Sequence, residues 1–197
     1  MPDAKRPEAR PVSRSRTTLT ELMVPSYANF GGKIHGGILL GLMDKVAYAC
    51  ASKHAGHYCV TVSVQGVDFR APVDVGDLVS LRGSVNHVGV TSLLVGIRVE
   101  AENVSTGEVR HTNTSYFTMV AKGPDGRPAR VPPLLLETRD DVRRYLEAIE
   151  RRALEAEYAR AFERAKSHIP IDAEHVLRNG HRCELAPGLD LRDEGGE

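Results

Sequence analysis

The sequence has no net charge, few cysteines and no long hydrophobic run. Its 26 basic residues balance 26 acidic ones, so the overall charge gives no reason to expect a nucleic-acid partner. No apolar run reaches membrane-spanning length and no hydrophobic segment follows the N-terminal charges, which predicts neither a membrane span nor a signal peptide. Cys50, Cys59 and Cys183 are too scattered for a disulfide framework. We therefore expect a cytoplasmic protein with free thiols.

Several familiar kinds of functional centre are also missing. No Gly-x-Ser-x-Gly motif suggests a serine hydrolase. His54, His57 and Cys59 resemble metal ligands, but they fall in a helix-to-strand turn without a fourth ligand, so no zinc site is predicted. No helix-turn-helix pattern accompanies the basic N-terminus, and DNA binding is not expected.

What the chain does contain is one apolar stretch with a single acid in its middle. A glycine-rich segment over 29–37 leads into a predicted helix over 37–52, which is apolar on most of its faces. Such a helix is expected inside the fold, covered on several sides. Asp44 lies in its middle with no lysine or arginine at i±3 or i±4. Because an unpaired buried carboxylate is costly, Asp44 is the first candidate for a functional residue.

The start of this helix suits a developing negative charge. Free N–H groups at a helix N-terminus fall near Gly36 and Gly37, where the helix dipole adds partial positive charge. Asp44 lies almost on the same face as Gly37 and within about 10 Å of the helix start at 1.5 Å per residue. A water between them could be activated by general base catalysis, or the carboxylate could attack a carbonyl directly. The sequence leaves both roles open.

The rest of the ordered pattern consists of strands. A β-prone run over 17–24 precedes the helix, and four strand patterns follow it within 60–69, 78–85, 93–101 and 109–122. This order predicts an α+β fold in which an antiparallel sheet wraps around one long central helix.

The flanking segments differ in composition from this domain, which we expect over 17–133. Residues 1–16 carry five basic side chains among prolines and predict a flexible basic arm. A charged C-terminal helix is expected within 134–167, with a short alanine-rich seam suited to packing on the sheet or on a sister subunit. The tail over 168–197 is polar and is predicted to be mostly disordered.

Six short motifs occur in one order along the central domain. They are Asn29-x-x-Gly32-x-x-His35-Gly-Gly37-x-x-Leu40-x-x-Met43-Asp44, Val60-Thr-Val-Ser-Val64, Phe69-x-x-Pro72-Val, Val75-Gly-Asp77, Val88-Gly-x-Thr-Ser92 and Phe117-x-Met-Val120. In this combination the chain resembles the hotdog-fold acyl-CoA thioester hydrolases, most of all the bacterial YciA-type and cytosolic brain-type enzymes. The resemblance implies a homo-oligomer, with a dimer as the minimum and a trimer of dimers as a common assembly. It places the active site at the dimer interface.

The resemblance also implies roles for individual residues. Asp44 would be the general base or nucleophile and would face Asn29 of the other subunit, which positions water or substrate. His35 could orient the substrate or could be structural. Acyl-CoA would be the substrate, with no metal and no further cofactor.

The coenzyme A moiety needs cations or N–H groups for its phosphates. The resemblance places pantetheine and nucleotide contacts at the turn that holds Gly89, Thr91 and Ser92. The cations near the exit of the last strand, which could meet the phosphates, are Lys122, Arg127 and Arg130. Candidates for the acyl pocket are Tyr48, Tyr58 and Phe69, any of which could instead belong to the core.

We expect an enzyme that hydrolyses acyl-CoA to a free carboxylic acid and CoA. Two alternatives stay open at this point. A hotdog enoyl-CoA hydratase or dehydratase would use His35 together with Asp44. A non-catalytic acyl-CoA sensor would bind the thioester without turnover.

Overall fold

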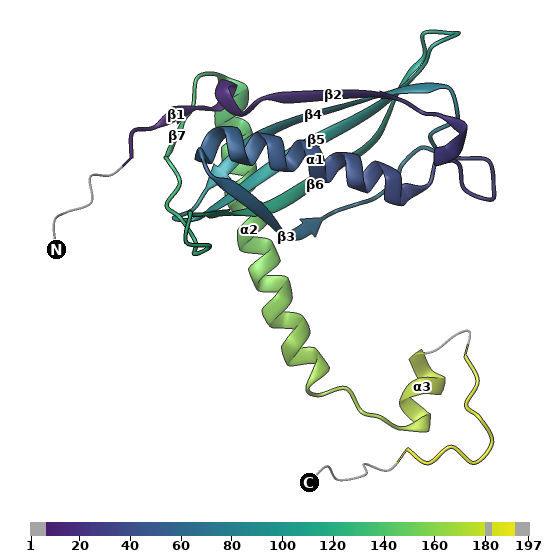
Figure 1. Ribbon diagram of the computed structural model, residues 1–197. Helices are drawn as coiled ribbons and strands as arrows, with labels where there is room; N and C mark the ends of the chain where they lie inside the picture. The colour runs from purple at the N-terminus through teal and green to yellow at the C-terminus, as the bar shows by residue number, and fades with distance from the viewer. Residues whose placement is uncertain (1–6, 180–182, 192–197) are drawn as a thin grey trace, which may run out of the picture. The chain divides into compact units, whose positions relative to one another are not determined.

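A five-stranded antiparallel sheet and one long helix form the centre of the protein (Figure 1). The computed structural model describes residues 7–179 and 183–191, in two units that span 1–150 and 151–197. In the first unit the strands run in the order β2-β4-β5-β6-β3. Their bounds are β2 (Thr17–Leu22), β3 (Tyr58–Gln65), β4 (Asp77–Val88), β5 (Ser92–Asn103) and β6 (Val109–Lys122). With α1 (Gly36–Ala55) packed on this sheet, the structure confirms the predicted hotdog fold.

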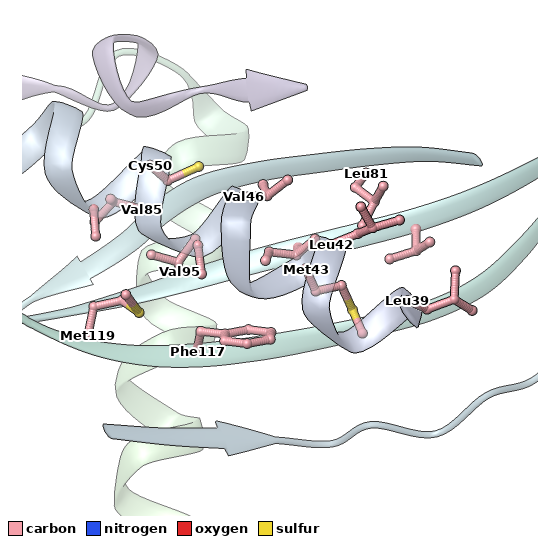
Figure 2. Close-up of a cluster of buried hydrophobic side chains, with 14 of the residues drawn as sticks. Leu39, Leu42, Met43, Val46, Cys50, Leu81, Val85, Val95, Phe117 and Met119 are labelled. Carbon is pink, nitrogen blue, oxygen red and sulfur yellow. The ribbon is translucent and has the colours of Figure 1, made fainter. Parts of the chain in front are cut away.

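The hydrophobic core lies between α1 and one face of the sheet (Figure 2). Leu42, Met43 and Val46 of the helix are buried against apolar side chains of β4, β5 and β6, among them Phe117. Each fully buried side chain of this size contributes about 1.5–3 kcal/mol. At Gly83 the helix lies directly on β4, because an added Cβ would come within 2.6 Å of Val46 Cγ1.

The ends of α1 lie slightly outside the range predicted from hydrophobicity. His35 is the N-cap residue, and its Nδ1 accepts a hydrogen bond from the Gly37 N–H at 2.9 Å. Gly56 ends the helix with φ of 73°, a left-handed conformation that favours glycine. Between them α1 has 20 residues.

The segment before β2 is not the flexible arm that composition predicted, at least from Arg10 onward. β1 (Arg10–Pro11) pairs in parallel with β7 (Leu134–Leu135), and η1 (Val12–Ser15) buries both Val12 and Ser15. Arg10 Nη1 donates to the His54 carbonyl at 2.6 Å, and Arg14 Nε donates to the Lys53 carbonyl at 3.2 Å. These cations stabilise the C-terminus of α1, which explains why the segment is held in place. Residues 1–6 lie outside the described residues.

The predicted charged helix is α2 (Arg139–Lys166). Its start is a capping box, since the Thr138 N–H donates to Asp141 Oδ2 at 3.0 Å and the Asp141 N–H donates to Thr138 Oγ1 at 3.1 Å. Arg16 forms an ion pair with the buried Asp141 at 3.0 Å. These contacts attach the first turns of α2 to the first unit.

The second unit holds the remainder of α2 and the short helix α3 (Ala173–Asn179). The rings of Tyr158 and Phe162 stack along α2, with their centroids 6.1 Å apart. Helix α3 lies inside the tail that was predicted to be mostly disordered, and residues 180–182 and 192–197 of that tail are outside the described part. Among the described residues, no helix is long and apolar enough to cross a bilayer.

Candidate functional site

Helix α1 has an exposed face, and Asp44 lies on it. Within one chain Gly37, Leu40, Asp44 and Tyr48 are all exposed, whereas Met43 one position earlier is fully buried. The sequence-based expectation of a helix covered on several sides therefore fails for this face. The reason is that one sheet can cover only one side of a helix. Asp44 consequently carries its charge at the surface of the single chain.

Thr61 of β3 is the partner of Asp44. Its hydroxyl donates to Asp44 Oδ1 at 2.5 Å, and Thr61 Oγ1 lies 3.2 Å from Met119 Sδ. The register of the β3–β6 ladder shifts between Thr61 and Ser63, so a bulge begins at Thr61. Sequence reasoning missed Thr61, because its place in an alternating strand is that of an ordinary outward-facing polar residue.

A pocket of about 330 Å³ opens beside this pair. It is lined by Asp44, Lys45, Tyr48, Tyr58, Cys59, Val60, Thr61 and Met119. The rings of Tyr48 and Tyr58 lie 5.9 Å apart at one side of it. Of the three predicted acyl-pocket candidates, these two are therefore brought to Asp44. Phe69 instead packs against Gly36, where an added Cβ would lie 3.2 Å from its ring.

Cys59 is the thiol nearest to this chemistry. Its side chain is 2% exposed, and burial raises the pKa of the thiol. The Cys59 Sγ lies 3.6 Å from the His57 carbonyl, to which it donates. A protonated, buried thiol is a poor nucleophile, so Cys59 is a weaker candidate for the reactive group than Asp44.

Asn29 organises the exposed loop before α1. Its Oδ1 accepts hydrogen bonds from the Gly31 N–H at 2.9 Å and from the Lys33 N–H at 3.2 Å. Lys33 forms an ion pair with Asp74, and this hydrogen bond holds the pKa of Asp74 below its usual value. Phe30 at the tip of the loop is fully exposed. The loop thus has a fixed shape and offers an uncovered surface.

The first N–H groups of α1 differ in whether they have a hydrogen-bond acceptor. Because His35 Nδ1 accepts the Gly37 N–H, that amide already has a partner. The Gly36 N–H has none within the described residues, which leaves it as the candidate donor to an oxyanion. His35 acts as the cap of α1, in line with the structural role that the sequence left open for it.

Three of the predicted coenzyme A contacts, Gly89, Thr91 and Ser92, lie at the turn between β4 and β5. The Gly89 N–H donates to the Ser92 carbonyl at 2.8 Å and closes the turn between β4 and β5. The Ala121 N–H donates to the Thr91 carbonyl at 2.9 Å, which brings the end of β6 to this turn. The turn residues therefore lie next to the end of β6. On its other side β6 pairs with β3, which lines the Asp44 pocket.

The three predicted cations near this turn have different surroundings. Lys122 is half-buried and pairs with Tyr58 in the β3–β6 ladder, while Arg127 is exposed in the turn after β6. Arg130 lines a cavity of about 730 Å³ together with Gly89 and the stacked rings of His87 and Tyr145. Nothing brings the three onto one ligand, so their contact with the phosphates stays a prediction. No group of three His, Cys, Asp or Glu side chains suited to a metal occurs in the described parts of the chain.

Comparison with known proteins agrees with this geometry. The family model described as "Thioesterase superfamily" matches residues 31–108, a range that includes Asp44 and Thr61. Protein VdlD of Helicobacter pylori is 43% identical over 141 residues, which cover 72% of this chain and 80% of VdlD. The acyl-CoA thioester hydrolase YkhA of Bacillus subtilis is 32% identical over 145 residues, covering 74% of this chain and 84% of YkhA. The chain belongs to the acyl-CoA hydrolases of the thioesterase superfamily.

Solved structures place this acyl-CoA hydrolase among enzymes of the same fold. A hexameric acyl-CoA thioesterase is 39% identical, with a TM-score of 0.74 over 77% of this chain and 97% of its own. The acyl-CoA hydrolase of Staphylococcus aureus, solved with butyryl coenzyme A and coenzyme A, is 28% identical. Its TM-score is 0.71, over 81% of this chain and 96% of its own. Alanine variants of the staphylococcal enzyme at an aspartate, an asparagine and a threonine have also been solved.

Proposed function

We propose that this hydrolase cleaves acyl-CoA with water through the carboxylate of Asp44, held by Thr61. The reaction adds water to the thioester carbonyl, breaks the carbon–sulfur bond and releases a carboxylic acid and the CoA thiol. The hydrogen bond from Thr61 to Asp44 on the exposed face of α1 carries this proposal. Thr61 occupies Oδ1, which leaves Oδ2 to take a proton from water or to attack the thioester carbon.

In the general-base form of this mechanism, Asp44 Oδ2 takes a proton from the attacking water. General base catalysis of this kind contributes typically ~10²- to 10⁴-fold. In the nucleophilic form, Asp44 attacks the carbonyl carbon, the CoA thiolate leaves, and water then hydrolyses the mixed anhydride. A single turnover in ¹⁸O-labelled water can identify the nucleophilic form: label in the Asp44 carboxylate would show that water attacked the aspartyl carbonyl of an anhydride.

We propose that two subunits complete each active site. Asp44 lies eight residues after Gly36, which is about 12 Å along the axis of α1. A thioester carbonyl and one attacking water bridge only roughly 8 Å between an amide donor and a carboxylate oxygen. This separation favours sites in which Asp44 and the Gly36 N–H come from different chains. A second copy with an antiparallel α1 would bring its Gly36 and its Asn29 loop to the first copy's Asp44.

The exposed surface around Asp44 supports such an assembly. Leu40 and Tyr48 on α1 and Val62 on the edge strand β3 are large apolar side chains open to solvent in the single chain. Patches of this kind mark interaction surfaces when they are contiguous. Two of the related thioesterases are hexameric, and we propose a homo-oligomer built from dimers here. We also propose a cytoplasmic location, in keeping with the rat relative, which is named a cytosolic hydrolase.

The variants of the staphylococcal enzyme support the same three residues. In that protein the altered asparagine stands 15 positions before the aspartate, and the threonine 17 positions after it. The same intervals separate Asn29, Asp44 and Thr61 in this chain. We therefore propose that Asn29 positions the substrate or the water opposite the Asp44–Thr61 pair.

The test is thiol release from a panel of acyl-CoAs, acetyl to palmitoyl, by wild type and Asp44→Asn. The amide keeps the shape of the side chain but cannot accept the proton or attack, so we expect kcat to fall ~10²- to 10⁴-fold. Circular dichroism and assembly size should be unchanged. A variant as active as wild type would remove Asp44 from the mechanism. Hydration of an enoyl-CoA that is lost in His35→Ala would point to the hydratase instead.

A further inference from the structure

The first turns of α2 lie over the face of the sheet opposite α1, and part of the space between helix and sheet is open. The ion pair of Arg16 with Asp141 and the stack of Tyr145 on His87 at 5.4 Å help to hold these turns in place. Elsewhere a cavity of about 560 Å³ separates helix and sheet. The cavity is partly open to solvent and has room for a ligand larger than a single water. It shares no lining residue with the pocket at Asp44.

Positive charge lines this cavity from both sides. Its five arginines are Arg16, Arg82, Arg98, Arg143 and Arg144, against two lining carboxylates, Asp140 and Glu147. On the sheet side, Arg82 and Arg98 share the single carboxylate of Glu100, which does not line the cavity. On the helix side, Arg143 and Arg144 share Asp140, and Arg143 also binds Glu147.

These ion pairs leave many donors unused. A guanidinium has five N–H groups, and each of these arginines uses only one to three of them in its ion pairs. The lining therefore combines a net positive charge with planar groups that match the geometry of phosphate oxygens.

A buried polar group on the floor of the cavity points to the same kind of ligand. Asn86 is 8% exposed, and its Oδ1 accepts a hydrogen bond from Ser84 Oγ at 3.1 Å. Its Nδ2 lies over Gly96, where any Cβ would clash with it, and donates to no described residue. An amide N–H₂ at the wall of the cavity that no protein acceptor takes can donate to an anion bound there. Gly96 thus creates the space that this donor needs.

We propose that this cavity is a binding site for a small phosphate-bearing anion. Arg98 and Arg82 contact it from the sheet, Arg143 and Arg144 contact it from α2, and Asn86 Nδ2 donates to it from below. The cavity falls within the ordinary size range of small-molecule sites. The phosphate groups can belong to an inorganic ion or to the nucleotide end of a larger molecule. Binding draws α2 and the sheet together by bridging their arginines.

The test is isothermal titration calorimetry of the full-length oligomer with two probes, pyrophosphate and adenosine 3′,5′-bisphosphate. The double variant Arg98→Gln/Arg143→Gln removes one cation from each side, and both side chains are about half exposed, so the fold should survive. Arg139→Gln is the matched control, because Arg139 is exposed at the start of α2 and does not line the cavity. Asn86→Ala tests the buried donor separately.

We expect saturable binding to wild type and to Arg139→Gln, weakened at least about tenfold in the double variant. Amide exchange of residues 139–150 should slow when the probe binds. Binding of pyrophosphate would assign an inorganic ion, and binding of the bisphosphate alone would assign a nucleotide. No saturable binding to wild type, or equal affinity in the double variant, would overturn the proposal.

Discussion

The two faces of α1 differ in burial and in the kind of side chain that they carry. The buried face presents Leu42, Met43 and Val46 to the sheet, with Gly83 of β4 left bare so that the helix can approach. The exposed face carries Gly37, Leu40 and Asp44. Apolar burial on one side stabilises the fold, and the Asp44 carboxylate on the other side is exposed, where we propose that it acts on the substrate.

This division explains how the chain keeps an acid on an apolar helix. Desolvating a carboxylate without a partner would oppose folding. Placed on the exposed face, Asp44 needs only the Thr61 hydroxyl to fix its orientation. The residues around it become covered only when a second copy assembles on this face, as proposed above. Fold and site can therefore be altered separately, and four predictions follow from that separation.

Moving a carboxylate to the buried face should have the largest effect. In Val46→Asp the new charge would lie at a position that is 1% exposed, and we expect a loss of about 4 kcal/mol or more in the free energy of unfolding. Leu40→Asp on the exposed face should leave the protomer folded and weaken assembly instead. Denaturant unfolding and sedimentation at one protomer concentration measure the two effects. Equal stability of Val46→Asp and wild type would refute the division.

Filling the space at Gly83 should have the next largest effect. The Cβ of Gly83→Ala would lie 2.6 Å from Val46 Cγ1 and 2.9 Å from Cys50 Sγ. We expect this overpacking to cost about 1–3 kcal/mol in the free energy of unfolding. Adding Val46→Ala removes the closer of these contacts. The double variant should therefore be more stable than the sum of the two single changes predicts. Strict additivity in a thermal unfolding cycle would show that the helix does not rest on β4 at this point.

Removing the Thr61 hydroxyl tests the exposed face. Thr61→Val keeps the β-branched shape but loses the hydrogen bond to Asp44. We expect kcat to fall about tenfold or more. The free energy of unfolding should change by less than about 1 kcal/mol. Thr61→Ser keeps the hydroxyl and should recover most of the rate. Initial rates of thiol release measure both variants. A fully active Thr61→Val would mean that Asp44 is oriented by other groups.

The smallest effect concerns pH and the C-terminal end of the buried face. His54 is fully buried, and burial lowers its pKa below the usual value of 6.5, although Nε2 lies 3.0 Å from the Pro132 carbonyl. Below pH 6.5 the unfolded chain takes up a proton that the folded chain does not. The contribution of His54 to the free energy of unfolding should therefore be fully present above pH 6.5. Below pH 6.5 it should fall by at most about 1.4 kcal/mol per pH unit. The fall should continue until the pH reaches the lower pKa of the folded state.

His54→Gln keeps a donor for the Pro132 carbonyl and removes the titration. Its unfolding free energy should lack the part of the pH dependence below pH 6.5 that His54 contributes. Identical pH profiles for wild type and variant would show that His54 titrates alike in both states.

Much of the fold was predictable because periodicity records which side of an element is buried. Strand β6 follows the predicted range 109–122, and the centre of α1 lies where its apolar run lies. Asp44 could be found because it had no partner on its own helix. Thr61 could not, since only the pairing of β3 beside α1 brings it to Asp44. The ordered segment at Arg10 was missed because its arginines bind helix carbonyls, a contact that composition does not reveal.

Roles that depend on a second chain were the hardest to derive from residues. The sequence-based placement of the oxyanion site near Gly36 and Gly37 did not foresee that His35 would accept the Gly37 N–H. Nor could hydrophobicity show that one side of α1 would remain open within the chain. The first feature follows from the His35 cap, and the second follows from the single sheet that covers α1. Both are consistent with the proposed active site between two copies of the chain.

The measurement that most directly tests the central claim is recovery of activity by mixing two inactive variants. Asp44→Asn and Asn29→Ala are each expected to be nearly inactive as pure oligomers. If each site takes Asp44 from one subunit and Asn29 from another, hybrids contain some sites with both wild-type residues. Unfolding and refolding the two together should then restore about a quarter of the wild-type rate, the share expected from random pairing. A mixture no more active than its parents would contradict a site shared between two copies.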